Sequence, residues 1–350
     1  MLRRLVGTLI ALVMTVQGSA ALAEAEYKIV TASERGTYFA IGKDLAKFVA
    51  SQAAIKLDVL PTAGSGENVR LLRYEPGVKF AVVQADVYQA FIDRAADGNT
   101  EAGTLIRPLR VILPLYETEI HFIARADSDL NFLHDIKNAK INGGLIGSGA
   151  ALITHTVYRM MFNGPIPEPN ASYLAMEEAL VKLVTDKTVD VVAVAAGQPS
   201  PLVANMKPEA QKLIKLLKFD PNHPASKGPL TTYKPAIIRA SSYPNLLTED
   251  LTTISVGAFL VTYDYYLKDT VGHMVRFARS LCENFLTLKN EGHPKWREVE
   301  LALPKLGPGW VYYPPTAREI QSCLAAKPKT QTRPSARRCS PEARILGLCE

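Results

Sequence analysis

The chain of 350 residues is poor in the residue types that build metal sites, with only four cysteines and six histidines. No two cysteines have the spacing of a zinc site or of a redox CxxC motif. Glu117, Glu119 and His121 alternate along one predicted strand and could be drawn as metal ligands, but no further ligand lies nearby. We therefore interpret these three residues as a polar edge that lines a cleft or faces solvent, and we expect neither a metal nor another cofactor.

Motifs of nucleophilic catalysis and of nucleotide binding are also missing. The hydrolase pattern G-x-S-x-G is absent, because Ala63 precedes Gly64-Ser65-Gly66 and Ile146 precedes Gly147-Ser148-Gly149. No lysine follows the glycine-rich run 143–149, which excludes a P-loop, and the run lacks the G-x-G-x-x-G spacing of a dinucleotide site. Spacing reveals no acid–base pair either, so we expect no catalytic residues and a protein that is not an enzyme.

Excess charge is confined to the two ends of the chain, although the net charge is +6. Residues 1–23 contain only Arg3 and Arg4 as charged residues, residues 327–350 carry six basic and two acidic residues, and the body between them is neutral. A neutral body offers no electrostatic surface for a phosphate backbone, so we expect no nucleic-acid partner. The basic segment 327–350, rich in Pro, Thr and Ser, is predicted to be a disordered tail.

Long apolar runs are absent after the first residues, and the N-terminus itself has the pattern of an export signal. Arg3 and Arg4 form a positive n-region, Leu5 to Val16 form an apolar h-region, and Ala21-Leu22-Ala23 forms a small-x-small cleavage site. A membrane anchor is the alternative, but the run falls short of the roughly 20 residues of a spanning helix. We expect cleavage near Ala23 and a soluble protein in the periplasm.

Disulfides form readily in such an oxidising compartment. Cys323, Cys339 and Cys349 lie near the C-terminus, and Cys282 lies further upstream. The simplest pairing joins Cys282 to Cys323 and Cys339 to Cys349, while four cysteines allow three connectivities. The sequence leaves the choice open.

Short β-rich runs alternate with helical patterns through the body of the chain. Strands at 27–31, 57–60 and 80–83 are each followed by a helical apolar pattern, which is the order of a parallel sheet with crossover helices. About 300 residues exceed one hydrophobic core, so we predict an α/β fold of two lobes, each a mostly parallel sheet flanked by helices, with a ligand cleft between them. The predicted monomer has lobe I at 24–122 plus 255–326 and lobe II at 123–254. Further strands are expected at 110–115, 120–124, 140–142, 189–195 and 255–262, and further helices at 87–95, 152–162, 177–183 and 269–288.

Small or polar loops follow the predicted strands, at the edge where open parallel sheets bind ligands. One of them, Thr62 to Asn68, contains a Gly-Ser-Gly turn that opens onto an amphipathic helix, and Gly36-Thr37-Tyr38 and Gly147-Ser148-Gly149 repeat this arrangement. Backbone N–H groups at such helix N-termini form a site for a carboxylate or a phosphate. The five loops are 33–38, 62–68, 84–86, 143–149 and 196–199.

Taken together and in this order, the loops resemble those of the TAXI family, the extracytoplasmic solute receptors of TRAP transporters. The resemblance runs from about Tyr27 to Tyr313. It implies a two-lobe periplasmic-binding-protein fold, an amino acid or dicarboxylate such as glutamate or 2-oxoglutarate as ligand, and TRAP membrane subunits as partners. The segments that carry it are Gly36-Thr37-Tyr38-Phe39-Ala40-Ile41-Gly42, Gly64-Ser65-Gly66-Glu67-Asn68-Val69-Arg70-Leu71-Leu72, Val83-Gln84-Ala85-Asp86, Gly144-Leu145-Ile146-Gly147-Ser148-Gly149 and Ala196-Gly197-Gln198-Pro199.

The resemblance also implies roles for individual residues. The first loop departs from the family by carrying Glu34-Arg35 in place of glycines, which would bring a guanidinium to the mouth of the cleft. Gly66 stands where the family commonly has a branched residue, and the chain beyond Ala326 lies outside the resemblance. The implied ligand-binding residues are Thr37, Tyr38, Ser65, Asn68, Gln84, Asp86, Ser148, Gly149 and Gly197.

The expected function is capture of a small carboxylate or amino acid by lobe closure, followed by delivery to a TRAP-type transporter. A receptor of the same fold that signals to a membrane sensor is the alternative, and an envelope enzyme is the third and least favoured class. For the favoured function we predict that the hydroxyls of Ser65 and Ser148 bind an anionic group from opposite lobes, because each lies in a glycine-flanked turn that leads into a helix.

Overall fold

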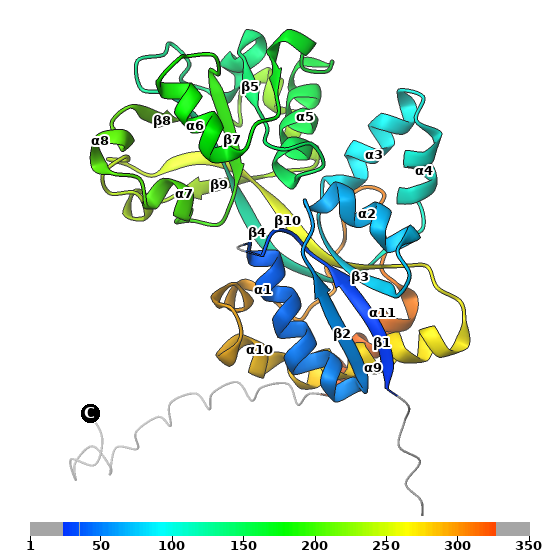
Figure 1. Ribbon diagram of the computed structural model, residues 1–350. Helices are drawn as coiled ribbons and strands as arrows, with labels where there is room; N and C mark the ends of the chain where they lie inside the picture. Colours follow the sequence, from blue (N-terminus) through cyan, green and yellow to red (C-terminus); the bar gives the residue numbers. More distant parts are fainter. Residues whose placement is uncertain (1–23, 35, 327–350) are drawn as a thin grey trace, which may run out of the picture.

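The structure is a computed structural model that describes residues 24–34 and 36–326 (Figure 1). Our expectations for the export signal at 1–23, for Arg35, for the tail at 327–350 and for a Cys339–Cys349 disulfide lie outside these residues. Within the described part, no helix is long and apolar enough to cross a membrane. The chain forms two α/β lobes joined by two long strands, β4 (Leu109–Arg125) and β10 (Leu251–Tyr263).

Lobe I is built on three parallel strands that have the predicted βαβ order. β1 (Ala25–Val30) lies between β2 (Ile55–Leu60) and β3 (Val78–Gln84) and pairs in parallel with both. Each strand ends in small or polar residues, after which the chain turns into a helix at the same edge of the sheet. The helices are α1 (Thr37–Asp44), extended by a π-helical turn (Leu45–Ala50) and a 3-10 turn (Ser51–Ala53), α2 (Ser65–Tyr74), α3 (Val87–Ala96) and the unexpected α4 (Thr100–Ile106).

The two joining strands run antiparallel through both lobes. The prediction of two separate strands, interrupted at 116–119, is wrong, because β4 continues through this segment. Its acidic residues are accommodated: Glu117 pairs with Lys234 and accepts a hydrogen bond of 3.2 Å from Ser255 Oγ on β10. The predicted lobe boundaries fall inside β4 and β10 and stay a prediction, since each strand belongs to both lobes.

Lobe II has a mixed sheet. β7 (Val191–Ala195) pairs antiparallel with β4 and parallel with β5 (Ile141–Asn142), while β6 (Ala171–Ser172) lies beside β5. β8 (Ile214–Leu216) pairs with β4, and β9 (Lys234–Ile238) pairs with β10. The helices are α5 (Gly149–Phe162), α6 (Met176–Val184), α7 (Pro201–Ala204) and α8 (Pro208–Gln211), with 3-10 helices at Leu133–Asn138, Glu168–Asn170, Pro224–Ser226, Pro229–Thr231 and Ala240–Ser242.

The sheet of each lobe is buried on both faces, which explains why several strands are continuous apolar runs. In lobe I one core packs between the sheet and helices α1 and α9 (Lys268–Glu283), and a second packs beneath α2, α3 and α4. In lobe II one core includes Val157 and Met161 of α5, and the other includes Leu180 and Leu183 of α6. These cores fix the strand ends, so the loops that follow them face each other across the lobe boundary.

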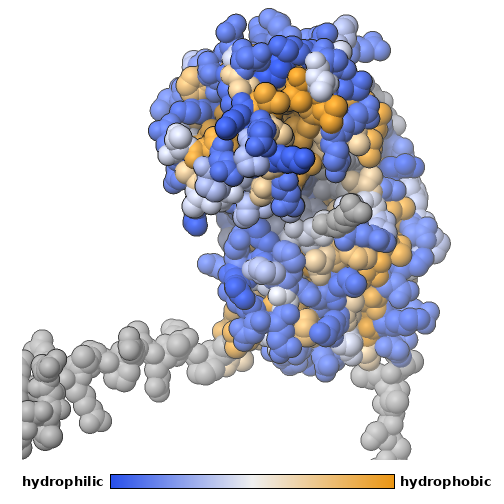
Figure 2. Space-filling view, turned by 60° about the vertical axis from the view of Figure 1, so that its left-hand side comes forward, coloured by the Kyte–Doolittle hydropathy of each residue, from blue (hydrophilic) through white to orange (hydrophobic). Residues whose placement is uncertain are grey.

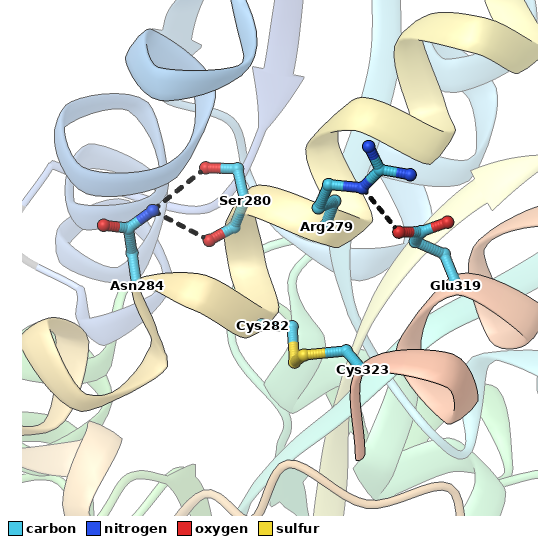
Figure 3. Close-up of a disulfide and its surroundings, with 6 residues drawn as sticks. All are labelled: Arg279, Ser280, Cys282, Asn284, Glu319 and Cys323. Carbon is cyan, nitrogen blue, oxygen red and sulfur yellow. Dashed lines mark hydrogen bonds and ion pairs between the residues drawn. A yellow bond between two sulfur atoms is a disulfide. The ribbon is translucent and has the colours of Figure 1, made fainter. Parts of the chain in front are cut away.

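The C-terminal helices differ from the prediction in two ways. The single helix expected at 269–288 is interrupted at Asn284 (φ −97°, ψ 11°), after which α10 (Phe285–Glu291) begins. A further helix, α11 (Pro314–Ala326), was not expected and lies against α9. Figure 3 shows the disulfide between Cys282 of α9 and Cys323 of α11, with Cα atoms 6.5 Å apart. One of the pairings that the sequence left open is therefore present.

Removal of this disulfide is expected to lower the free energy of unfolding by about 2–4 kcal/mol, because the crosslink restricts the unfolded chain across a long loop. Its two cysteines are separated by 41 residues in the sequence. Denaturant unfolding of the double variant Cys282→Ser with Cys323→Ser, compared with the unchanged protein in oxidising buffer, measures the effect. An unchanged unfolding midpoint would contradict the prediction.

Candidate functional site

A cavity of about 550 Å³ lies between the lobes, where the loops after the strands meet. Lobe I contributes the loops after β1 and β2, the end of β3, the middle of β4 and the 3-10 helix Pro294–Glu298, and lobe II contributes the start of α5 and the loop after β7. Figure 2 shows a recess at the waist where the two lobes meet. A cavity of this volume suits a small organic molecule.

Three helix N-termini reach this cavity. Its lining includes Gly36-Thr37-Tyr38 at the start of α1, Gly64-Ser65 at the start of α2 and Gly149-Ala150 at the start of α5. The first N–H groups of a helix have no partner within the helix, and the helix dipole adds partial positive charge at the same end. The convergence of three such ends makes the cavity favourable for an anion.

Glycines allow the two lobes to touch at these loops. A Cβ added to Gly64 would lie 3.0 Å from the backbone N of Gly149, and one added to Gly66 would lie 3.4 Å from the carbonyl oxygen of Gly147. Gly64 also has a φ of 134°, a conformation that side chains rarely adopt. Gln84 of lobe I reaches across the boundary, since a Cβ on Gly149 would lie 2.6 Å from its Oε1. The structure is therefore closed around the cavity.

Two residues of the cavity wall carry a buried polar atom without a partner within the described ranges. Gln84 Oε1 and Tyr116 OH have no hydrogen-bond partner among the described residues. Leaving such atoms unpaired is costly, so a small movement of either side chain toward a bound polar molecule would be favourable. Burial raises the pKa of the Tyr116 hydroxyl and of the neighbouring Tyr38 hydroxyl, so both stay protonated and can donate a hydrogen bond.

The 3-10 helix that carries Lys295 is anchored to the core of lobe I. Trp296 is fully buried, and its Nε1 donates a hydrogen bond of 2.9 Å to Asp44 Oδ2 on α1. The same carboxylate oxygen accepts the backbone N–H of His293 at 2.7 Å. These contacts fix the backbone on both sides of Lys295, so its side chain has a defined path to the cavity.

Lys295 supplies a cation to the cavity wall. Its side chain is 13% exposed, and its ammonium donates to Glu298 Oε2 at 2.7 Å and lies 5.4 Å from the centroid of the Tyr116 ring. The stem of the side chain crosses to lobe II, where a Cβ on Gly197 would lie 2.8 Å from its Cε. An ammonium held in this way can form a charge-assisted hydrogen bond with a carboxylate.

The lobe II loop after β7 is positioned by the side chain of Gln198. Its Nε2 donates to Glu119 Oε1 at 3.0 Å and to the carbonyl oxygen of Ile237 at 2.7 Å, while its Oε1 accepts the backbone N–H of Arg239 at 2.7 Å. This amide is fully used by the scaffold. Its role is to hold Gly197 at the edge of the cavity.

The structure brings some predicted ligand-binding residues to the cavity and places others elsewhere. Asn68 is fully buried, and its Nδ2 donates to the carbonyl oxygens of Thr31 and Val82. Ser148 Oγ accepts the N–H of Ala151 and caps α5. Together with Asp86, which is considered below, these residues serve the scaffold, which corrects the expected ligand contacts. The six that line the cavity are Thr37, Tyr38, Ser65, Gln84, Gly149 and Gly197.

Several lining residues were missed by sequence reasoning. Tyr116 and Thr118 lie on the part of β4 between the two predicted strands, 110–115 and 120–124. Their alternation with Glu117 and Glu119 was a signal for a strand with two distinct faces. Lys295 and Glu298 follow no strand or glycine-rich loop, so no motif marked them.

The alternative metal site at Glu117, Glu119 and His121 is not supported. No group of three or more His, Cys, Asp or Glu side chains in the described ranges is arranged to hold a metal ion. The expectation that His121 belongs to a polar edge is wrong. His121 is fully buried, and its Nε2 lies 2.8 Å from the Tyr243 hydroxyl. Burial lowers the pKa of His121 to about 4, so its ring is neutral at neutral pH.

Ser65→Ala is expected to lower ligand affinity about tenfold, whereas Ser148→Ala should mainly lower stability, by about 1 kcal/mol. Ser65 Oγ accepts the backbone N–H of Gln84 at 3.0 Å. This contact joins two buried residues of the cavity wall, so its loss should loosen the lobe I side of the cavity. Titration calorimetry and denaturant unfolding of both variants separate the two effects. Equal losses of affinity in the two variants would restore the symmetrical roles expected from the sequence.

Comparison with known proteins shows the family of this chain. The model of the NMT1-like family matches residues 29–305. No curated protein sequence matches the chain. Similar solved structures include the periplasmic binding protein BugD, with 13% identity, a TM-score of 0.46 and coverage of 86% of this chain and 95% of that one. Others are the periplasmic aliphatic sulphonate binding protein SsuA from Escherichia coli (14%, TM-score 0.40, coverage 87% and 84%) and a TctC solute binding protein from Polaromonas (13%, TM-score 0.40, coverage 88% and 98%).

Proposed function

The chain belongs to the NMT1-like family, and from this premise we propose that it is an extracytoplasmic receptor that binds a small carboxylate in the cavity between its lobes. The observation that carries the proposal is the meeting of three helix N-termini and Lys295 in one interlobe cavity. Each of these groups stabilises negative charge. Among the described residues of the lining, Glu298 is the only acidic one, and Lys295 already pairs with it.

The arrangement also suits an amino acid. A carboxylate can bind at the helix N-termini and Lys295, while Glu298 is an acceptor for an ammonium group. L-glutamate and 2-oxoglutarate are therefore the ligands we propose to test first.

Lobe closure accounts for capture without catalysis. A ligand that contacts Ser65 of lobe I and the start of α5 in lobe II stabilises the closed state, because only that state offers both sets of contacts. Reopening would then release the ligand unchanged.

Thermal unfolding in the presence of candidate ligands tests this function. L-glutamate, 2-oxoglutarate and succinate should raise the unfolding temperature, and a ligand at a hundredfold its dissociation constant should add roughly 2.7 kcal/mol of stability. Uncharged amides of the same shape, such as succinamide, serve as matched controls and should have little effect. Equal stabilisation by acids and amides would show that the cavity does not select an anion.

We further propose that the mature receptor begins near Glu24, is a periplasmic monomer and delivers its ligand to TRAP-type membrane subunits. The export pattern at 1–23 and the resemblance of the loops support this part of the proposal. Mass spectrometry of the exported protein gives its N-terminus, and uptake by membrane vesicles that contain the subunits measures delivery. Binding without any dependence of uptake on the receptor would favour a sensing role.

A further inference from the structure

Asp86 lies between β3 and α3 at the lobe boundary, and it is fully buried without lining the cavity. Its Oδ2 accepts a hydrogen bond of 2.6 Å from the hydroxyl of Tyr233, a residue of lobe II that is 2% exposed. Its Oδ1 has no hydrogen-bond partner in the described part of the chain. A carboxyl group of lobe I is thus enclosed by lobe II, and only one of its two oxygens accepts a hydrogen bond from another side chain of the described residues.

The surroundings of this carboxyl group provide no compensating cation. The titratable group that acts on it is the hydroxyl of Tyr233. Burial and the Asp86 charge in turn raise the pKa of the Tyr38 hydroxyl on α1 and of Tyr233, and Asp93 on α3 also acts on Tyr233. The Tyr233 hydroxyl and the N–H of Asp86 itself favour the carboxylate, but no Lys or Arg of the described ranges contributes. Burial outweighs these hydrogen bonds and raises the pKa of Asp86 to about 7.

Opening of the lobes would remove this enclosure. Tyr233 is packed in a core of lobe II together with Val157 and Met161, so it moves with that lobe. Water would then reach Asp86, and a hydrated aspartate has a pKa of about 3.9. The carboxyl group therefore binds a proton more tightly in the closed state than in the open state.

We propose that lobe closure is coupled to protonation of Asp86, so that the receptor captures its solute together with one proton. The proton comes from solvent, binds the carboxylate as the lobes close and returns to solvent as they open. Asp86 and Tyr233 act as positioning residues of the closed state, and neither contacts the solute. The inference rests on the proposed function, because closure on a solute is the step that it describes.

The expected pH dependence follows from the difference between the two states. Between about pH 4 and pH 7 the closed state holds a proton that the open state lacks, so closure weakens as the pH rises, by up to about tenfold per unit. Above about pH 7 the carboxyl group is ionised in both states, and closure should no longer depend on its titration.

Small-angle X-ray scattering of the protein without added solute tests the coupling. The radius of gyration should be larger at pH 8 than at pH 5, because the open population increases, and Asp86→Asn should abolish this change. Asp97→Asn is the matched control: Asp97 also crosses the boundary, in an ion pair with Arg159, but its side chain is 53% exposed. This variant should keep the pH response. The proposal would be overturned if the unchanged protein and Asp86→Asn showed the same change in radius of gyration. It would also be overturned if neither protein responded to pH.

Titration calorimetry with L-glutamate, in two buffers of different ionisation enthalpy, provides a second readout. Uptake of close to one proton is expected at pH 5.5, and none in Asp86→Asn. Tyr233→Phe should weaken binding while keeping some proton uptake, since burial of the carboxyl group remains. L-glutamate binding without proton uptake would overturn the coupling and leave the proposed function intact. If no carboxylate binds although scattering shows the Asp86-dependent response, the proposed function fails and the coupling stands.

Discussion

Gly64→Ala is expected to lower ligand affinity about a hundredfold, or roughly 2.7 kcal/mol. The added methyl group would lie 3.0 Å from the backbone N of Gly149 and 3.6 Å from backbone atoms of Ser148, so the closed lobes would have to separate. Backbone atoms cannot move aside as the end of a flexible side chain can. The variant should therefore remain able to fold but lose the closed state in which both lobes contact the ligand.

Gly98→Ala is the matched control for this effect. Gly98 also has a positive φ, of 99°, but an added Cβ there would meet nothing within 4 Å. Its substitution should cost about 1–2 kcal/mol of stability through backbone strain and leave affinity within a few-fold. Calorimetric titration with the carboxylate that stabilises the protein most compares the two variants. Equal affinities would show that contact between the loops does not control binding.

Lys295→Gln is expected to lower the affinity for carboxylates by about ten- to a hundredfold. A hydrogen bond to a charged group contributes about 1.5–3 kcal/mol, and the anchored backbone beside Lys295 places its ammonium at the cavity at little further entropic cost. Glutamine keeps much of the length of the side chain and a hydrogen-bond donor but removes the charge.

Lys234→Gln provides the comparison for Lys295→Gln. Lys234 pairs with Glu117 on the other face of β4, its side chain is 73% exposed, and it does not line the cavity between the loops. This variant should bind as the unchanged protein does. If Lys295→Gln retains full affinity for a carboxylate, the anion is held by the helix N-termini alone, and our assignment of the cation is wrong.

The sequence predicted the fold well where the pattern was local. Strands β1, β2 and β3 lead into small-residue turns as predicted. β3 is buried along almost its whole length, whereas β2 at the edge of the sheet alternates buried and exposed residues over 55–58. The continuous β4 was missed because two strands, at 110–115 and 120–124, were predicted in its place. The partners of Glu117 and Glu119 on the segment between them, Lys234 and Gln198, are distant in the sequence. Long-range pairing of this kind overrides local composition.

The site was predictable to the extent that it is made of loops after strands. Thr37, Ser65 and Gly149 are the first residues of α1, α2 and α5, so the pattern of a small-residue turn before a helix was enough to predict them. Lys295 could not be predicted, because its position depends on the packing of Trp296 against α1. An aspartate in a loop after a strand, such as Asp86, is often a ligand contact. Only the structure shows that lobe II encloses this one.

A crystal structure of the mature protein grown with the carboxylate that gives the largest thermal shift tests the central claim most directly. We predict one carboxylate group at the N-termini of α2 and α5, within hydrogen-bonding distance of Ser65 Oγ, the N–H groups of Gly149 and Ala150, or Lys295 Nζ. A ligand bound elsewhere, with the interlobe cavity empty, would contradict the account.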